Sequence, residues 1–268
     1  MPTIATNTAA NSALFFLNRN SDAQSASLGK ISSGSRIVSS ADDAAGLAVS
    51  DQLQSDITSL QTAAQTTQQV DSLLQIADGG LSRISDILQR AKSLATQFNS
   101  GTLDATSQGF INDEYTALVT EIDLIVQSTQ YNGTALIDGT FNPAAVVVGV
   151  NATDTIGLNL TTVNAGSAAL TLPATLTGTA DITAIDGAIG TIGSARATVG
   201  ALTSTVGFQG EVIDTQIQNL QAARSSISDV DIAEEQTNFT NFQVLTEAAI
   251  SGLAQANQLK TSLLALLR

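Results

Sequence analysis

The sequence predicts a mainly α-helical protein, with a long coiled-coil-like helical rod, a small β-hairpin region, and paired N- and C-terminal helices. Apolar residues recur at alternating steps of three and four residues over long stretches, which is typical of coiled coils. Only three of the 268 residues are proline, so long uninterrupted helices are allowed. Residues 134–181 contain no Lys or Arg and are rich in Thr, Val, Gly and Ala, which indicates a separate β-rich insert.

The first long helix is predicted to begin near Ser40 and Asp43, whose spacing is that of a capping box. Among its heptad positions only Asp56 and Thr67 are neither apolar nor small. These positions are Leu53, Asp56, Leu60, Ala63, Thr67, Val70, Leu74, Ala77, Leu81, Ile84, Leu88, Ala91, Ala95 and Phe98. At about 1.5 Å per residue the helix is roughly 80 Å long, so we expect a rod.

A shorter amphipathic helix is predicted after a break at residues 99–102, and it can fold back on the first. Its apolar positions are Ile111, Tyr115, Leu118, Ile122 and Ile125. The pair Asn132-Gly133 ends this helix. Two apolar runs, 146–150 and 156–160, flank the turn residues 151–154 and predict a β-hairpin.

A second long helix has apolar heptad positions at strict seven-residue spacing. These positions are Ile185, Ile192, Val199, Val206, Ile213, Leu220 and Ile227. A new helix is expected after residues 228–231, and the first and last helices can pair only if the chain returns to its start.

The two terminal helices each carry one apolar stripe, which alone buries too little surface to offset chain entropy. We therefore expect the chain ends to be disordered in a monomer and covered by partner subunits in an assembly. The alternative is an ordinary coiled-coil tail that packs within its own chain. The predicted organisation has three parts: residues 1–42 with 226–268 as terminal helices, 43–133 with 182–225 as a helical rod domain, and 134–181 as a small β-rich insert within it.

The residues needed for most catalytic sites are missing from this chain. Histidine and cysteine are absent, which excludes imidazole bases, thiol nucleophiles, zinc sites built from these residues, and disulfides. The paired acids Asp42-Asp43, Asp229 with Asp231, and Glu234-Glu235 are interpreted as helix caps. The sequence thus predicts a protein that is not an enzyme and that has no cofactor, no catalytic residues and no metal.

The charge and hydropathy of the chain also exclude two classes of partner. The net charge of −14 would repel nucleic acids and anionic membranes. No apolar run is long enough to span a membrane, and the first 18 residues have no positive side chain of the kind that begins a secretory signal peptide. We therefore expect that export, if it occurs, uses another route.

Several blocks of the chain resemble bacterial flagellin, in the order found in that family. Residues 28–53, which include Ser39-Ser-Ala-Asp-Asp-Ala-Ala-Gly-Leu47, resemble its N-terminal signature. Ser225-Ser-Ile-Ser-Asp-Val-Asp-Ile-Ala-Glu-Glu235, Ala254-Gln-Ala-Asn-Gln258 and Leu263-Leu-Ala-Leu-Leu-Arg268 resemble its C-terminal block. Glu121-Ile-Asp123 with Thr129-Gln-Tyr-Asn-Gly133 resembles the segment before its β-hairpin. The resemblance covers essentially the whole chain.

The resemblance implies a short flagellin without large outer domains, a structural subunit that polymerises into the flagellar filament for swimming. It implies self-association as a helical homopolymer, secretion by the flagellar type III route, and contact with the export apparatus, an export chaperone, the filament cap and the hook-junction proteins. The filament-core contacts would be Leu14, Leu17, Leu28, Ile31, Phe242, Leu245, Ala249, Leu259, Leu263 and Leu266. The alternatives are a hook–filament junction protein and an unrelated coiled-coil adaptor.

The resemblance also implies an innate immune receptor as a partner of the released monomer. Leu88-Gln-Arg-Ala-Lys-Ser-Leu-Ala95 resembles the motif on which receptor recognition centres, and the matching positions are Arg90, Leu94 and Glu114. Ser93 departs from the acidic residue common there. The alternative interpretation is that Arg90 and Glu114 form a solvated surface pair worth under about 1 kcal/mol.

Overall fold

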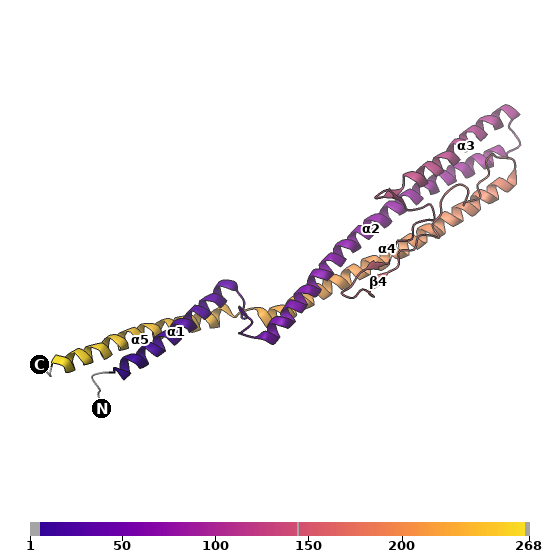
Figure 1. Ribbon diagram of the computed structural model, residues 1–268. Helices are drawn as coiled ribbons and strands as arrows, with labels where there is room; N and C mark the ends of the chain where they lie inside the picture. The colour runs from indigo at the N-terminus through magenta and orange to yellow at the C-terminus, as the bar shows by residue number, and fades with distance from the viewer. Residues whose placement is uncertain (1–5, 144, 266–268) are drawn as a thin grey trace. The chain divides into compact units, whose positions relative to one another are not determined.

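The computed structural model describes residues 6–143 and 145–265. Within them the chain is mainly α-helical, as predicted, with short strands between α3 and α4 (Figure 1). The elements are α1 (Thr8–Ser33), α2 (Ala44–Phe98), α3 (Ala105–Ser128), β1 (Gln130–Tyr131), β2 (Thr134–Ala135), β3 (Val146–Val147), β4 (Thr155–Ile156), α4 (Thr179–Ser228) and α5 (Ile232–Ala265). No helix in the described part of the chain has an apolar stretch that could span a membrane.

The chain divides into two compact units. The terminal unit consists of Met1–Ser55 with Asn219–Arg268, and the bundle unit consists of Asp56–Gln218. The division expected from the sequence, at residues 42/43 and 225/226, remains a prediction.

In the bundle unit, α2, α3 and α4 lie side by side (Figure 1) and enclose the main core. Every predicted heptad position of α2 from Leu60 to Ala95 is buried. Thr67 is tolerated there because its hydroxyl donates a hydrogen bond to the carbonyl of Ala63 at 2.8 Å. The predicted α4 positions from Ile185 to Ile213 are also buried, so the heptad pattern correctly identified the core faces of both helices.

A glycine lets α3 end close against α2. A Cβ atom added at Gly80, in the middle of α2, would lie 2.6 Å from the Thr129 hydroxyl oxygen. Thr129 is the C-cap residue of α3, and its backbone N–H donates to Ile125. The missing side chain at Gly80 therefore permits the close approach of the two helices.

The segment between α3 and α4 forms two separate hairpins. The predicted hairpin is present as β3 and β4, paired Val146 with Ile156 and Val147 with Thr155, but each strand is shorter than expected. The register accounts for the shorter first strand: the Val148 N–H donates to the Asp154 carbonyl, so the residues between them form the turn. Further along the chain, the Leu160 N–H donates to the Phe141 carbonyl rather than across this hairpin.

The second hairpin, β1 with β2, was not predicted. Asn132 and Gly133 both have positive φ, 50° and 77°, and form its two-residue turn. This is the geometry of a type I′ turn, for which Asn-Gly is the strongest sequence signal. The sequence therefore contained the signal for this hairpin, although we interpreted Asn132-Gly133 only as the end of a helix.

The predicted capping box at Ser40 is wrong. Helix α2 begins at Ala44, and its cap is Asp43, whose carboxylate accepts a hydrogen bond from the Gly46 N–H at 2.9 Å. The carboxylate of Asp42 accepts instead from the N–H groups of Val38 and Ser39. These bonds hold the pKa of Asp42 below its usual value. The two adjacent acids thus anchor the loop and cap the helix, consistent with their interpretation as structural residues.

In the terminal unit, α1 and α5 pack antiparallel, as predicted. The side chain of Asn7 caps α1 by accepting from Ala10 and also donates to the Ala256 carbonyl of α5. At the other end, α1 stops at Gly34 in the left-handed conformation, and Ser35 forms a β-bridge with Asp229. The paired helices are therefore tied together near both ends.

Candidate interaction surfaces

The terminal unit leaves much of its apolar surface open. Leu14 is 46% exposed, Leu28 54%, Leu245 49% and Leu259 58%. Most of the corresponding heptad positions of the bundle unit are buried. Two helices can cover only one face of each other, whereas three helices enclose a core.

The predicted filament-core residues fall into three groups. Leu14, Leu28, Leu245 and Leu259 are exposed. Leu17, Ile31, Phe242 and Ala249 are half-buried between the helices. Leu263 lies in α5 but its side chain is not described, and Leu266 lies outside the described residues.

Two large aromatic side chains were missed as candidates. Phe15 and Phe16 are exposed on α1, and their rings meet edge-on with centroids 5.6 Å apart. They lie off the heptad positions, so the periodicity did not select them. The run Leu14-Phe15-Phe16 nevertheless indicated an exposed apolar surface. Three consecutive side chains of a helix point in different directions, so one partner helix cannot bury all of them.

The predicted receptor residues separate in the structure. The Arg90 guanidinium of α2 binds the Glu114 carboxylate of α3 at 2.6 Å, and both side chains are about half exposed. Leu94, in contrast, is 1% exposed and packs with Ala91, Ile111 and Tyr115. The side chain of Leu94 is therefore covered by α3 in the folded unit, and a receptor contact at this position remains a prediction.

Every Lys and Arg of the bundle unit takes part in an ion pair. Besides Arg90, Lys92 binds Asp186, Arg196 binds Asp78, and Arg83 binds Asp86 one turn further along α2. Three of the four pairs join different helices, which favours the observed alignment of α2 with α3 and α4. All four are solvent-exposed, so each contributes under about 1 kcal/mol.

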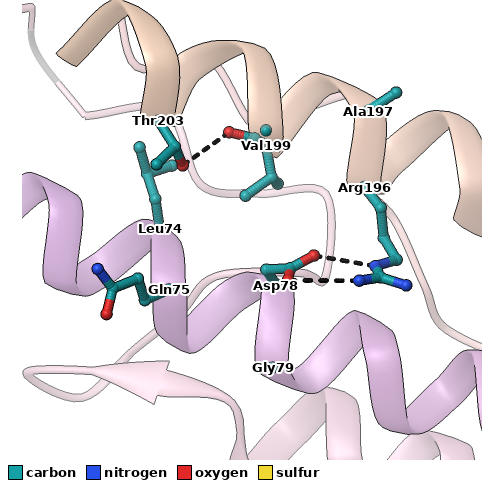
Figure 2. A pocket seen from close by; sticks show the side chains of 9 residues that line it. Leu74, Gln75, Asp78, Gly79, Arg196, Ala197, Val199 and Thr203 are labelled. Atoms are coloured by element: carbon teal, nitrogen blue, oxygen red, sulfur yellow. Dashed lines mark hydrogen bonds and ion pairs between the residues drawn. The ribbon is translucent and has the colours of Figure 1, made fainter. Parts of the chain in front are cut away.

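The Arg196–Asp78 pair borders an open groove between α2 and α4 (Figure 2). Its volume is about 660 Å³, and Leu74 and Val199 form part of its wall. The hydrogen bond from Arg196 to Asp78, 2.9 Å long, raises the pKa of the guanidinium. The Thr203 hydroxyl in its wall donates to the Val199 carbonyl, and the Asp78 carboxylate is paired with Arg196, so these two groups are not bonded to each other. No group of three potential metal-ligating side chains occurs among the described residues.

Comparison with known proteins identifies the family. The profile of the bacterial flagellin N-terminal helical region matches residues 4–142, and that of the C-terminal helical region matches residues 182–267. The chain belongs to the bacterial flagellin family. Flagellins are structural subunits of the flagellar filament, an extracellular appendage, and they assemble with copies of themselves.

Individual flagellins resemble this chain over most of their length. A flagellin of Bacillus subtilis is 36% identical, with 98% of each chain covered, and one of Halalkalibacterium halodurans is 36% identical over 89% of this chain and 90% of its own. A flagellar filament 33 kDa core protein of Treponema phagedenis is 35% identical over 89% and 90%. The crystal structure of Bacillus cereus flagellin matches 60% of this chain and 94% of its own at 30% identity, with a TM-score of 0.50. These relatives favour a filament subunit and give no support to the hook-junction alternative.

Proposed function

We propose that the terminal unit of this flagellin supplies the subunit contacts of the filament core, through the exposed apolar side chains of α1 and α5. The observation that carries this proposal is the contrast in burial between the two units. Among the described residues of the terminal unit, the buried set is small: Ser27, Ile37, Ser50 and Ala256. Neighbouring copies that cover the exposed leucines would therefore supply the missing core.

Covering the exposed leucines of α1 and α5 with neighbouring subunits would stabilise a filament substantially, because the same contact recurs at every subunit. Burying the exposed part of one leucine contributes roughly 1 kcal/mol. Leu14 and Leu28 on α1, with Leu245 and Leu259 on α5, offer several such contributions per subunit. Because every copy presents the same helices, the contact recurs at each added subunit and supports an open polymer.

A charge at Leu259 tests the proposal. We expect Leu259→Asp to abolish filament formation, because an unpaired buried carboxylate costs several kcal/mol per subunit. The monomer should keep its helix content, since Leu259 is 58% exposed in the single chain. Sedimentation and electron microscopy measure assembly, and far-UV circular dichroism measures helix content.

Leu259→Met is the matched control, because it keeps an apolar side chain of similar volume at the same position. It should assemble like the wild type. Normal filaments from Leu259→Asp would show that this side chain is not buried between subunits.

We further propose that the protein acts structurally rather than as an enzyme, and that it reaches the filament through the flagellar export apparatus with an export chaperone. The filament cap and hook-junction proteins would then be its partners at the filament ends. Family membership and the absence of histidine and cysteine support these proposals. In a strain without flagellar export, the chain should stay inside the cell.

We also infer that Arg90 and Glu114 form the accessible part of a surface read by an innate receptor. Support comes from their exposure on adjacent helices, whereas Leu94 is buried. In a receptor reporter assay on monomer, we expect Arg90→Ala and Glu114→Ala each to lower the signal. Equal signals from wild type and both variants would leave only a surface ion pair, and Arg83→Ala, which breaks an exposed pair within α2, is the control.

A further inference from the structure

We propose that Asn132 is a site of spontaneous covalent modification in the folded protein, by cyclisation of its side chain onto the backbone of Gly133. Asn132 and Gly133 form the exposed tip of the β1–β2 hairpin. The side chain of Asn132 has no hydrogen-bond partner among the described residues, and the Gly133 N–H donates to no acceptor there. Both reacting groups are therefore exposed to solvent, and neither is held by a hydrogen bond in the described part of the chain.

The reaction needs only water. The Gly133 backbone nitrogen attacks the side-chain carbonyl carbon, Cγ, of Asn132 and loses its proton to solvent base. The bond from Cγ to the amide nitrogen then breaks, ammonia leaves, and a five-membered succinimide ring remains. Water adds to one of the two ring carbonyls and opens the ring to aspartate or to isoaspartate, in which the backbone runs through the side chain.

Glycine as the following residue favours the ring closure. With no Cβ, Gly133 puts no side chain beside its attacking nitrogen. The sequence contains no other Asn-Gly pair. Glycine is the residue that hinders attack on the preceding asparagine side chain least, and Gly133 occupies that position in this turn.

The fold restrains the other asparagines of the chain. Those within α1, α3, α4 and α5 precede residues whose N–H groups are committed to helical hydrogen bonds. They are Asn11, Asn18, Asn20, Asn112, Asn219, Asn238, Asn241 and Asn257.

The asparagines outside helices are restrained in other ways. Asn142 precedes Pro143, which has no N–H. The side chains of the others are held by hydrogen bonds. Asn7 bonds to Ala10 and Ala256, Asn99 to Ala95, Asn151 to Asp154, Asn159 to Thr161, and Asn164 to Gly166. Asn132 alone among the described asparagines has a free side chain and a free following amide.

Damage from the modification should stay at the hairpin tip. Isoaspartate lengthens the backbone of the turn and disturbs the pairing of Tyr131 with Thr134. Beyond the tip, the hairpin is anchored by Thr129, Leu136 and Ile137, which are buried against the bundle unit. The helices should therefore survive the change.

Hydroxylamine, which splits succinimides, and isoaspartate mapping by peptide mass spectrometry test the proposal on the full-length folded protein at mildly alkaline pH. We expect wild type to accumulate isoaspartate at position 132 and to be cut by hydroxylamine between Asn132 and Gly133. Asn132→Asp, which is compatible with the same turn type, should lose the cut. This variant carries the negative charge that modification creates, but not the longer backbone of isoaspartate. If the modified wild type and Asn132→Asp both keep the helix content of unmodified wild type, the damage is local to the turn.

Two outcomes would overturn the proposal. If only urea-unfolded wild type is modified at Asn132, the folded turn protects the site. If isoaspartate forms equally at Asn151, which lies in an exposed loop but donates to Asp154, the fold does not select Asn132. Neither outcome depends on filament assembly.

Discussion

Tyr115 shows how a single side chain can be buried at a cost. It is fully buried in the core between α2, α3 and α4, yet its hydroxyl has no hydrogen-bond partner among the described residues. An unsatisfied buried polar group costs about 1 to 3 kcal/mol. We expect Tyr115→Phe to keep or raise stability in denaturant unfolding, whereas Tyr115→Ala should lose about 3 to 5 kcal/mol by leaving a cavity. A destabilised Phe variant would mean that the hydroxyl has a partner, such as a buried water.

The same residue predicts a loss of stability at high pH. Burial, together with the nearby carboxylate of Asp181, raises the pKa of Tyr115 from 10.0 to about 12. Between these values the unfolded chain releases the proton while the folded chain keeps it. The free energy of unfolding should therefore fall as pH rises from 10 toward 12, by on the order of 2 kcal/mol. Tyr115→Phe should lack this part of the fall, which urea titrations of both proteins can measure.

Among the secondary-structure elements, α5 depends on a local cap. The Asp231 carboxylate accepts hydrogen bonds from the N–H groups of Ala233 at 2.9 Å and Glu234 at 3.2 Å. Asp231→Ala should destabilise the first turn of α5 by about 1 kcal/mol, whereas Asp231→Asn keeps the acceptor and should cost little. Hydrogen exchange of the first α5 amides measures the difference. Equal protection in the two variants would contradict a capping role.

Helix and hairpin positions were predictable where a repeated pattern identified them. The heptads marked the buried faces of α2 and α4, and the two apolar runs on either side of residues 151–154 located the β3–β4 hairpin. The cap of α2 was less predictable, because Ser40 and Asp43 are both good capping residues and only the backbone path selects one. The β1–β2 hairpin was missed through an incomplete interpretation of Asn132-Gly133.

For the whole molecule, the net charge of −14 predicts that assembly depends on salt. The only basic side chains of the bundle unit are already paired within it, so neighbouring copies would meet mainly as acidic surfaces. Raising ionic strength from about 0.01 to 0.15 M shortens the Debye length from about 30 to 8 Å. We expect faster polymerisation and a lower critical concentration at the higher salt, measured by light scattering. Equal rates at both would show that repulsion between copies is unimportant.

The sequence by itself determined the helical class, the buried faces of the long helices and the family resemblance, because periodicity and motifs are written in neighbouring residues. Only the tertiary structure decided which surfaces stay open. Leu94 and Leu259 are similar residues on long helices, but Leu94 is 1% exposed and Leu259 is 58% exposed. The difference arises because α3 covers the Leu94 side of α2, whereas the two-helix pairing of α1 and α5 leaves Leu259 uncovered. Burial depends on how many elements surround a helix, and that number is a property of the folded chain.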